Sequence, residues 1–190
     1  MLKDTNERYG SVSIVLHWAM GLAIFAMFGL GVWMRTLDYY DAWYNRAPEL
    51  HKSAGMLLLF LLLARLAWRL VNAHPGLLGR AWERLAALTM HRAQYVLMLI
   101  VMLTGYLIPT AEGKGISVFG WFVVPALIGF DKHQADIIGL IHKYSAWALV
   151  VLATGHAAAA LKHHFVDRDA TLTRMLGFGP NINNTKEKTP

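Results

Sequence analysis

Nine histidines are the main chemical resource of this 190-residue chain, which contains no cysteine. The lack of cysteine excludes disulfides, iron–sulfur clusters, thiolate zinc sites, C-x-x-C-H haem attachment and thiol catalysis. Ionisable residues inside long apolar helices are rare and indicate a functional site. Five of the histidines fall inside such apolar stretches: His17, His51, His91, His142 and His156. The chemistry to be explained is therefore that of imidazole.

The spacing of four of these histidines places them at two levels. His142 and His156 are 14 residues apart, which on one helix puts them on nearly the same face and about 21 Å apart along its axis. His17 lies near the start of the first apolar stretch, and His51 at the start of the second. In a bundle whose successive helices run in opposite directions, His17 then shares a level with His156, and His51 shares a level with His142.

Two stacked haem sites need this arrangement, because each iron takes two axial imidazoles from different helices. The residue four positions after each histidine lies beside it on the helix and is small in all four cases: Gly21, Gly55, Ala146 and Ala160. Small residues let a bulky partner approach a helix closely. Zinc or copper ligands would have to converge on one ion, which two levels about 21 Å apart cannot do. For any single histidine, a polar contact between helices is the alternative.

We therefore predict two b-type haems. We call the level of His17 and His156 the inner level and the level of His51 and His142 the outer level. The iron of the inner haem is expected to take His17 and His156 as its axial ligands, and the iron of the outer haem to take His51 and His142.

Four apolar stretches are long enough to carry these histidines across a membrane, at about 12–33, 51–70, 85–108 and 138–161. About 20 apolar residues span a bilayer, and a helix satisfies its own backbone there. The first stretch reads as a retained anchor, since no small-residue cleavage site accompanies it. The third is expected to be closed by Pro109. The predicted fold is an all-α integral membrane protein, with residues 1–178 forming a four-transmembrane-helix bundle that holds two b-type haems.

The remaining segments are predicted to lie outside the bilayer. Residues 110–137 are expected to form a periplasmic capping loop, because the apolar run at 116–130 is short and interrupted by Gly120, Pro125 and Gly129. That run should lie on the membrane surface or dip into it. We find no strand pattern, nucleotide-binding glycine motif or solenoid repeat. Residues 179–190 are polar and rich in helix breakers, which predicts a flexible cytoplasmic tail.

The net charge of +6 is explained by membrane orientation. Twelve of the 18 lysines and arginines flank the N-terminus, the second loop and the tail, and the other six flank the first and third loops. The positive-inside rule then predicts a multi-pass protein of the bacterial inner membrane with both termini cytoplasmic. Six acidic residues balance the six outer cations. The net charge of the outer loops is therefore zero and does not indicate electrostatic attraction of an anionic donor. Because the charges sit in gaps between apolar runs, nucleic-acid binding is excluded.

Four sequence segments resemble the bacterial cytochrome b561 family, four-helix dihaem membrane proteins that include superoxide oxidase. They are LHW at 16–18, ELHKSAG at 49–55, LIHKYSAWALV at 140–150, and GHAAAALKHHF at 155–165 with the following DRDATLTRM. The resemblance covers nearly the whole chain. It implies axial ligands at the positions of His17, His51, His142 and His156. The ELHKSAG stretch and the GKGISVFGWF loop at 113–122 indicate a branch other than superoxide oxidase itself.

Four further residues are candidates for the site, while no catalytic residue is assigned. Arg65 stands 14 residues after His51 and should face the inner level, either as a haem propionate contact or as a positive-inside residue at a helix end. His91 either lines a quinone pocket or hydrogen-bonds a neighbour. His163 and His164 end the fourth span, where they either shuttle protons at a quinone site or form an interfacial polar cluster.

The resemblance implies electron transfer between a periplasmic-side donor and membrane ubiquinone. Superoxide is the candidate donor, which would make the chain a superoxide:ubiquinone oxidoreductase. The alternative is a cytochrome b subunit that exchanges electrons between quinone and a periplasmic redox protein. A non-redox structural bundle is the third reading. In each case the lipid bilayer is a partner.

Overall fold

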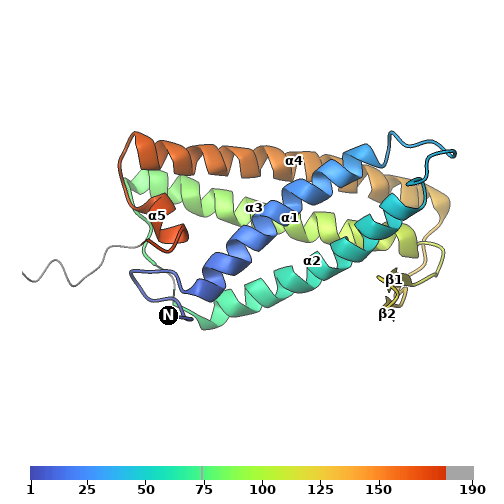
Figure 1. Cartoon of the computed structure of the whole chain (residues 1–190), viewed down its shortest axis with the longest axis horizontal. Helices are drawn as coiled ribbons and strands as arrows, with labels where there is room; N and C mark the ends of the chain where they lie inside the picture. The colour runs from blue at the N-terminus through green and yellow to red at the C-terminus, as the bar shows by residue number, and fades with distance from the viewer. Residues whose placement is uncertain (74, 179–190) are drawn as a thin grey trace, which may run out of the picture.

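Four long helices form the body of the protein, of which a computed structural model describes residues 1–73 and 75–178. They are α1 (Ser11–Trp33), α2 (Arg46–Val71), α3 (Ala81–Thr110) and α4 (Lys132–Phe165), followed by the short α5 (Thr171–Met175). Successive helices run in alternating directions, so the N-terminus and α5 lie at one end of the bundle and the 34–45 loop at the other (Figure 1). The predicted tail at 179–190 lies outside the described residues.

Each of the four long helices is long and apolar enough to cross a membrane. Large apolar side chains such as Val15, Leu22 and Val151 are each about two-thirds exposed on the outside of the bundle, where lipid would cover them. The prediction of a four-helix membrane bundle is confirmed.

Some helices begin or end outside the apolar stretches predicted from the sequence, because polar capping residues lengthen them. Helix α4 begins at Lys132, within the segment predicted as the capping loop. The Asp131 carboxylate accepts a hydrogen bond from the Gln134 backbone N–H, and the Gln134 side-chain oxygen accepts one from the Asp131 N–H. This reciprocal cap starts the helix before the apolar pattern begins. Helix α3 continues through Pro109 to Thr110, so the prediction that Pro109 closes it was wrong by one residue.

A β-hairpin lies in the segment between α3 and α4, where no strand was expected. Strands β1 (Ile116–Val118) and β2 (Phe122–Val124) pair antiparallel, with Val118 opposite Phe122. At the turn, Phe119 and Gly120 have φ values of 50° and 75°, the positive values that tight hairpin turns require and glycine tolerates. Three-residue strands are too short to show an alternating pattern, which is why the sequence prediction was wrong here.

The buried core has two parts, one inside the bundle and one under the hairpin. The first contains Met20, Leu58, Leu62, Met98 and Leu149. The second contains Met56, Tyr106, Ile116 and Val118, and so joins α2 and α3 to β1. The hairpin is therefore packed onto the bundle at the end where α2 begins (Figure 1).

Candidate functional site

The structure brings the four histidines together in two pairs, both of which include a residue of α4. We call His17 and His156 the inner pair and His51 and His142 the outer pair. The ring centroids are 6.2 Å apart in the inner pair and 6.3 Å apart in the outer pair. The inner pair joins α1 to α4, and the outer pair joins α2 to α4.

These separations fit two imidazoles on opposite sides of one iron. A metal–imidazole nitrogen bond is about 2 Å long, so two rings that bind one ion from opposite sides have centres about 6 Å apart. Both pairs have this separation. By their separation, the two pairs therefore fit a haem iron at each level.

The hydrogen bond of His142 agrees with metal binding through its other ring nitrogen, Nε2. Nδ1 of His142 lies 2.9 Å from the Val101 carbonyl oxygen, and since a carbonyl only accepts, Nδ1 carries the proton. The lone pair is then on Nε2, the tautomer that metal-binding histidines adopt. Nδ1 of His51 is buried and has no hydrogen-bond partner within the described part of the chain.

Two glycines let neighbouring helices approach the outer rings, and sequence reasoning missed both. A Cβ at Gly31 would lie 3.1 Å from Cε1 of His51, and one at Gly105 would lie 3.0 Å from Cε1 of His142. Gly21 and Gly55, the glycines that the sequence analysis identified, have different surroundings. A Cβ at Gly21 meets nothing within 4 Å, and one at Gly55 meets only the end of Met27, at 3.8 Å. Gly21 and Gly55 thus face open space or a flexible side chain, while Gly31 and Gly105 lie where a larger residue would collide with the rings.

The hairpin is fastened to the bundle close to the outer pair. Buried Ser53, two residues after His51, donates its hydroxyl to the Ser117 carbonyl at 3.2 Å and accepts from the Phe119 N–H at 3.1 Å. The Tyr106 hydroxyl donates to the Pro125 carbonyl at 2.7 Å and accepts from the Leu127 N–H at 3.0 Å. Ser53 of α2 and Tyr106 of α3 therefore hold the backbone of the hairpin and of the residues that follow it.

The inner pair has charged neighbours. Arg65 donates hydrogen bonds to Nδ1 of His17 at 3.1 Å, to the Leu16 carbonyl at 2.9 Å and to the Tyr95 hydroxyl at 3.0 Å. The Tyr95 ring also lies 5.4 Å from the guanidinium of Arg69. Arg65 is thus at the level of His17, where the sequence places it, and its guanidinium is held among polar groups.

A third histidine, His91 of α3, reaches the inner level. Its ring centroid is 5.2 Å from that of His156, in an edge-to-face arrangement. This separation is shorter than the distance of about 6 Å across an iron, so His91 lies beside His156 and not opposite to it across a metal ion.

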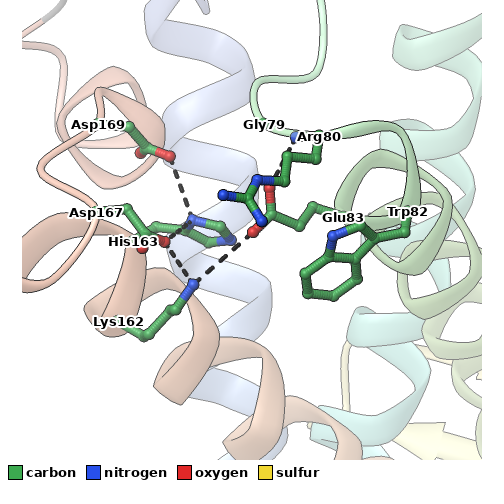
Figure 2. Close-up of a pocket in the computed structure, with 8 residues that line it drawn as sticks. All are labelled: Gly79, Arg80, Trp82, Glu83, Lys162, His163, Asp167 and Asp169. Atoms are coloured by element: carbon green, nitrogen blue, oxygen red, sulfur yellow. Dashed lines mark hydrogen bonds and ion pairs between the residues drawn. The ribbon is translucent and has the colours of Figure 1, made fainter.

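A cavity of about 470 Å³ lies at the end of the bundle that carries the inner pair. The start of α3, the end of α4 and the turn after α4 line it, and His163 is one of the lining residues (Figure 2). His163 follows His156 by seven residues, about 10 Å along the helix. Neither His91 nor His164 lines this cavity. The His164 ring packs edge-to-face on Phe165.

Ion pairs connect the walls of this cavity. Lys162 lies 2.7 Å from Oδ2 of Asp167 and 3.8 Å from Oε1 of Glu83, which joins the turn after α4 to α3. The hydrogen bond from Lys162 holds the pKa of the Asp167 carboxyl below its usual range. Asp167 is therefore charged at neutral pH.

Four apolar spanning helices with two pairs of half-buried imidazoles define a membrane cytochrome of the b type. The sequence profile of the prokaryotic cytochrome b561 family matches residues 8–178. The chain belongs to this family, which confirms the resemblance in its sequence and assigns it to membrane electron transport with b-type haem.

Three curated relatives cover nearly the whole chain. Cytochrome b561 homolog 2 of Escherichia coli strain K12 is 51% identical over 92% of this chain and 94% of its own length. Cytochrome b561 homolog 1 of the same organism is 30% identical over 90% and 97%. The probable superoxide oxidase CybB of Yersinia pestis is 25% identical over 90% and 97%. The chain is thus more similar to homolog 2 than to this superoxide oxidase.

Proposed function

We propose that this protein transfers electrons between a donor on the outer side of the inner membrane and ubiquinone, through one haem held by each histidine pair. The observation that carries the proposal is the near-equal separation within the two pairs, 6.2 and 6.3 Å. Two bound haems would supply reversible one-electron chemistry. Each pair would hold its haem with two imidazoles, which would leave no open position for oxygen.

The side chains around the two pairs have separate roles in this proposal. The Val101 carbonyl fixes the tautomer of His142, and Ser53 and Tyr106 hold the hairpin segment at the end of the bundle that carries the outer pair. Arg65 brings a positive charge to the inner pair, and its guanidinium would be free to pair with a haem propionate if it left Nδ1 of His17. Since a guanidinium only donates, its departure would also free Nδ1 of His17 to carry its own proton.

The cavity beside His163 is the candidate ubiquinone site. It combines an imidazole and an ammonium, from His163 and Lys162, with the indole of Trp82 (Figure 2). Quinone reduction takes up protons, and an imidazole that faces a cavity can supply them. His91 lies outside this cavity and faces His156 instead, so among the three quinone-site candidates we favour His163.

Orientation follows from the distribution of charge. Twelve of the 18 cations lie at the end that carries the inner pair and α5 or in the tail, so we place this end and both termini in the cytoplasm. The hairpin is then periplasmic, and residues 179–190 form a cytoplasmic tail beyond the haem domain at 1–178.

Superoxide is the donor we favour, because one relative of similar length is named a probable superoxide oxidase. Two superoxide ions would each lose one electron and leave as oxygen, while one ubiquinone takes up both electrons and two protons. The test is a superoxide pulse delivered to the oxidised, purified protein. Haem reduction should be fast and should disappear when superoxide dismutase is present. An equal rate with the dismutase would contradict superoxide as the donor.

A periplasmic redox protein is the second candidate donor. The outer loop at 34–45 exposes Tyr39 and Tyr40, 78% and 92% accessible, and aromatic side chains are enriched where proteins dock. Under this alternative, superoxide reduces the haems no faster than the dismutase control, while a reduced periplasmic extract reduces them at a rate that Tyr39→Ser with Tyr40→Ser lowers.

A further inference from the structure

A second cluster of ligand-type side chains lies at the cytoplasmic end of α4, apart from the two histidine pairs. Nδ1 of His163 is 2.7 Å from Oδ2 of Asp167 and 3.2 Å from Oδ2 of Asp169. All three donor atoms lie within 4.8 Å of one another. Figure 2 shows both carboxylates directed at the same imidazole nitrogen.

The turn after α4 builds this arrangement. Arg168 has a φ of 55°, which folds the chain back so that the residues on both sides of it face His163. The Asp169 backbone N–H donates to the His163 carbonyl at 3.1 Å, and its Oδ1 accepts from the Thr171 N–H at 2.8 Å. Asp169 is thus held on one oxygen, which leaves Oδ2 for a ligand.

We propose that, when the cavity holds no ubiquinone, His163, Asp167 and Asp169 form a binding site for a first-row divalent metal ion such as Zn²⁺. Donor atoms that share one ion at about 2 Å lie about 3 Å from each other, and the two carboxylate oxygens lie 2.7 and 3.2 Å from Nδ1 of His163. One imidazole nitrogen with two carboxylate oxygens suits Zn²⁺, whereas Mg²⁺ and Ca²⁺ prefer oxygen ligands alone.

The surroundings supply the other requirements of a metal site. The cavity of about 470 Å³ opens onto all three side chains, which gives an entry path and room for water as further ligands. Three protein ligands plus water is the usual composition of an open zinc site. The Lys162 ammonium now bonds Oδ2 of Asp167, so an incoming cation has to displace it.

The test is a Zn²⁺ titration of the oxidised holoprotein, purified without a histidine tag and treated with a chelator, followed by calorimetry. We expect one site per chain that Asp169→Asn and His163→Gln each weaken about tenfold or more. The matched control is His164→Gln, the neighbouring imidazole that lies outside the cluster, and it should leave the affinity unchanged. The haem spectrum of each variant reports whether the bundle is intact.

Lys162→Gln is the variant that separates a metal site from a simple ion-pair cluster. Removing the competing ammonium should tighten Zn²⁺ binding about threefold or more, whereas loss of a merely structural ion pair would not. The proposal is overturned if the wild-type protein has no stoichiometric site, if Asp169→Asn binds as tightly as wild type, or if millimolar Mg²⁺ displaces Zn²⁺. Because the titration uses neither quinone nor reductant, its failure leaves the electron-transfer proposal intact.

Discussion

The outer and inner histidine pairs have nearly the same separation but very different surroundings. The outer pair lies near a hairpin that Ser53 and Tyr106 fasten to the bundle, and two glycine contacts and a backbone carbonyl set its rings. The inner pair lies among Arg65, Tyr95 and His91, near a polar cavity. The outer pair is thus surrounded by packing and backbone contacts, and the inner pair by charged and polar side chains. Under the proposed function, this difference would separate electron entry from proton-coupled exit.

Replacing one histidine of a pair should have the largest effect of the changes considered. It should remove the haem of that pair and leave the other haem bound. His142→Ala should abolish the outer haem and leave the inner one, and His156→Ala should do the reverse, because each residue belongs to one pair. The haem-to-protein ratio after each change measures this. His91→Ala is the control: its ring is beside His156, so it should retain both haems. Loss of a haem from His91→Ala would place His91 among the ligands.

Filling a glycine contact should disturb the outer level alone. In Gly31→Val the new side chain meets the His51 ring, since a Cβ there would already be 3.1 Å from Cε1. We expect several-fold faster loss of the outer haem to a haem-scavenging protein. Gly29→Val on the same helix is the matched control, because a Cβ at Gly29 meets nothing within 4 Å while the cost in helix propensity is equal. Equal haem loss from both variants would refute a packing role for Gly31.

Loosening the hairpin should expose the outer site without moving its ligands. Ser53→Ala removes two hydrogen bonds to the hairpin backbone, which should cost about 1–3 kcal/mol of local stability. Amide hydrogen exchange should rise in residues 116–124 and stay unchanged around His17. Uniform exchange across both ends of the bundle would mean that Ser53 supports the whole fold and not the cap.

Removing the inner guanidinium should give the smallest effect. Arg65→Gln takes a positive charge away from His17, which favours the oxidised haem and should lower the inner midpoint potential by tens of millivolts, a shift of the order expected for one charge at a partly buried site. Potentiometric titration of the two haem bands measures the shift. A larger change at the outer haem would contradict the assignment of levels.

The sequence was sufficient to predict the four spans and the pairing of histidines by level, because hydropathy and helical rise are local properties. It placed Arg65 at the level of His17 for the same reason. It did not predict the hairpin, whose short strands depend on Ser53 and Tyr106 of other elements. Gly31 and Gly105 were missed because they face histidines on neighbouring helices, at no fixed sequence separation. The contacts of Asp167 and Asp169 with His163 depend on the positive φ of Arg168, which no sequence pattern predicts.

The ratio of haem to protein in the purified wild-type chain tests the central claim most directly. Two histidine pairs predict two b-type haems per chain, both low-spin because imidazoles would occupy both axial positions. A ratio near two with only low-spin signals in electron paramagnetic resonance is the expected result. A ratio of one, or a high-spin signal from an iron with an open position, would contradict the account.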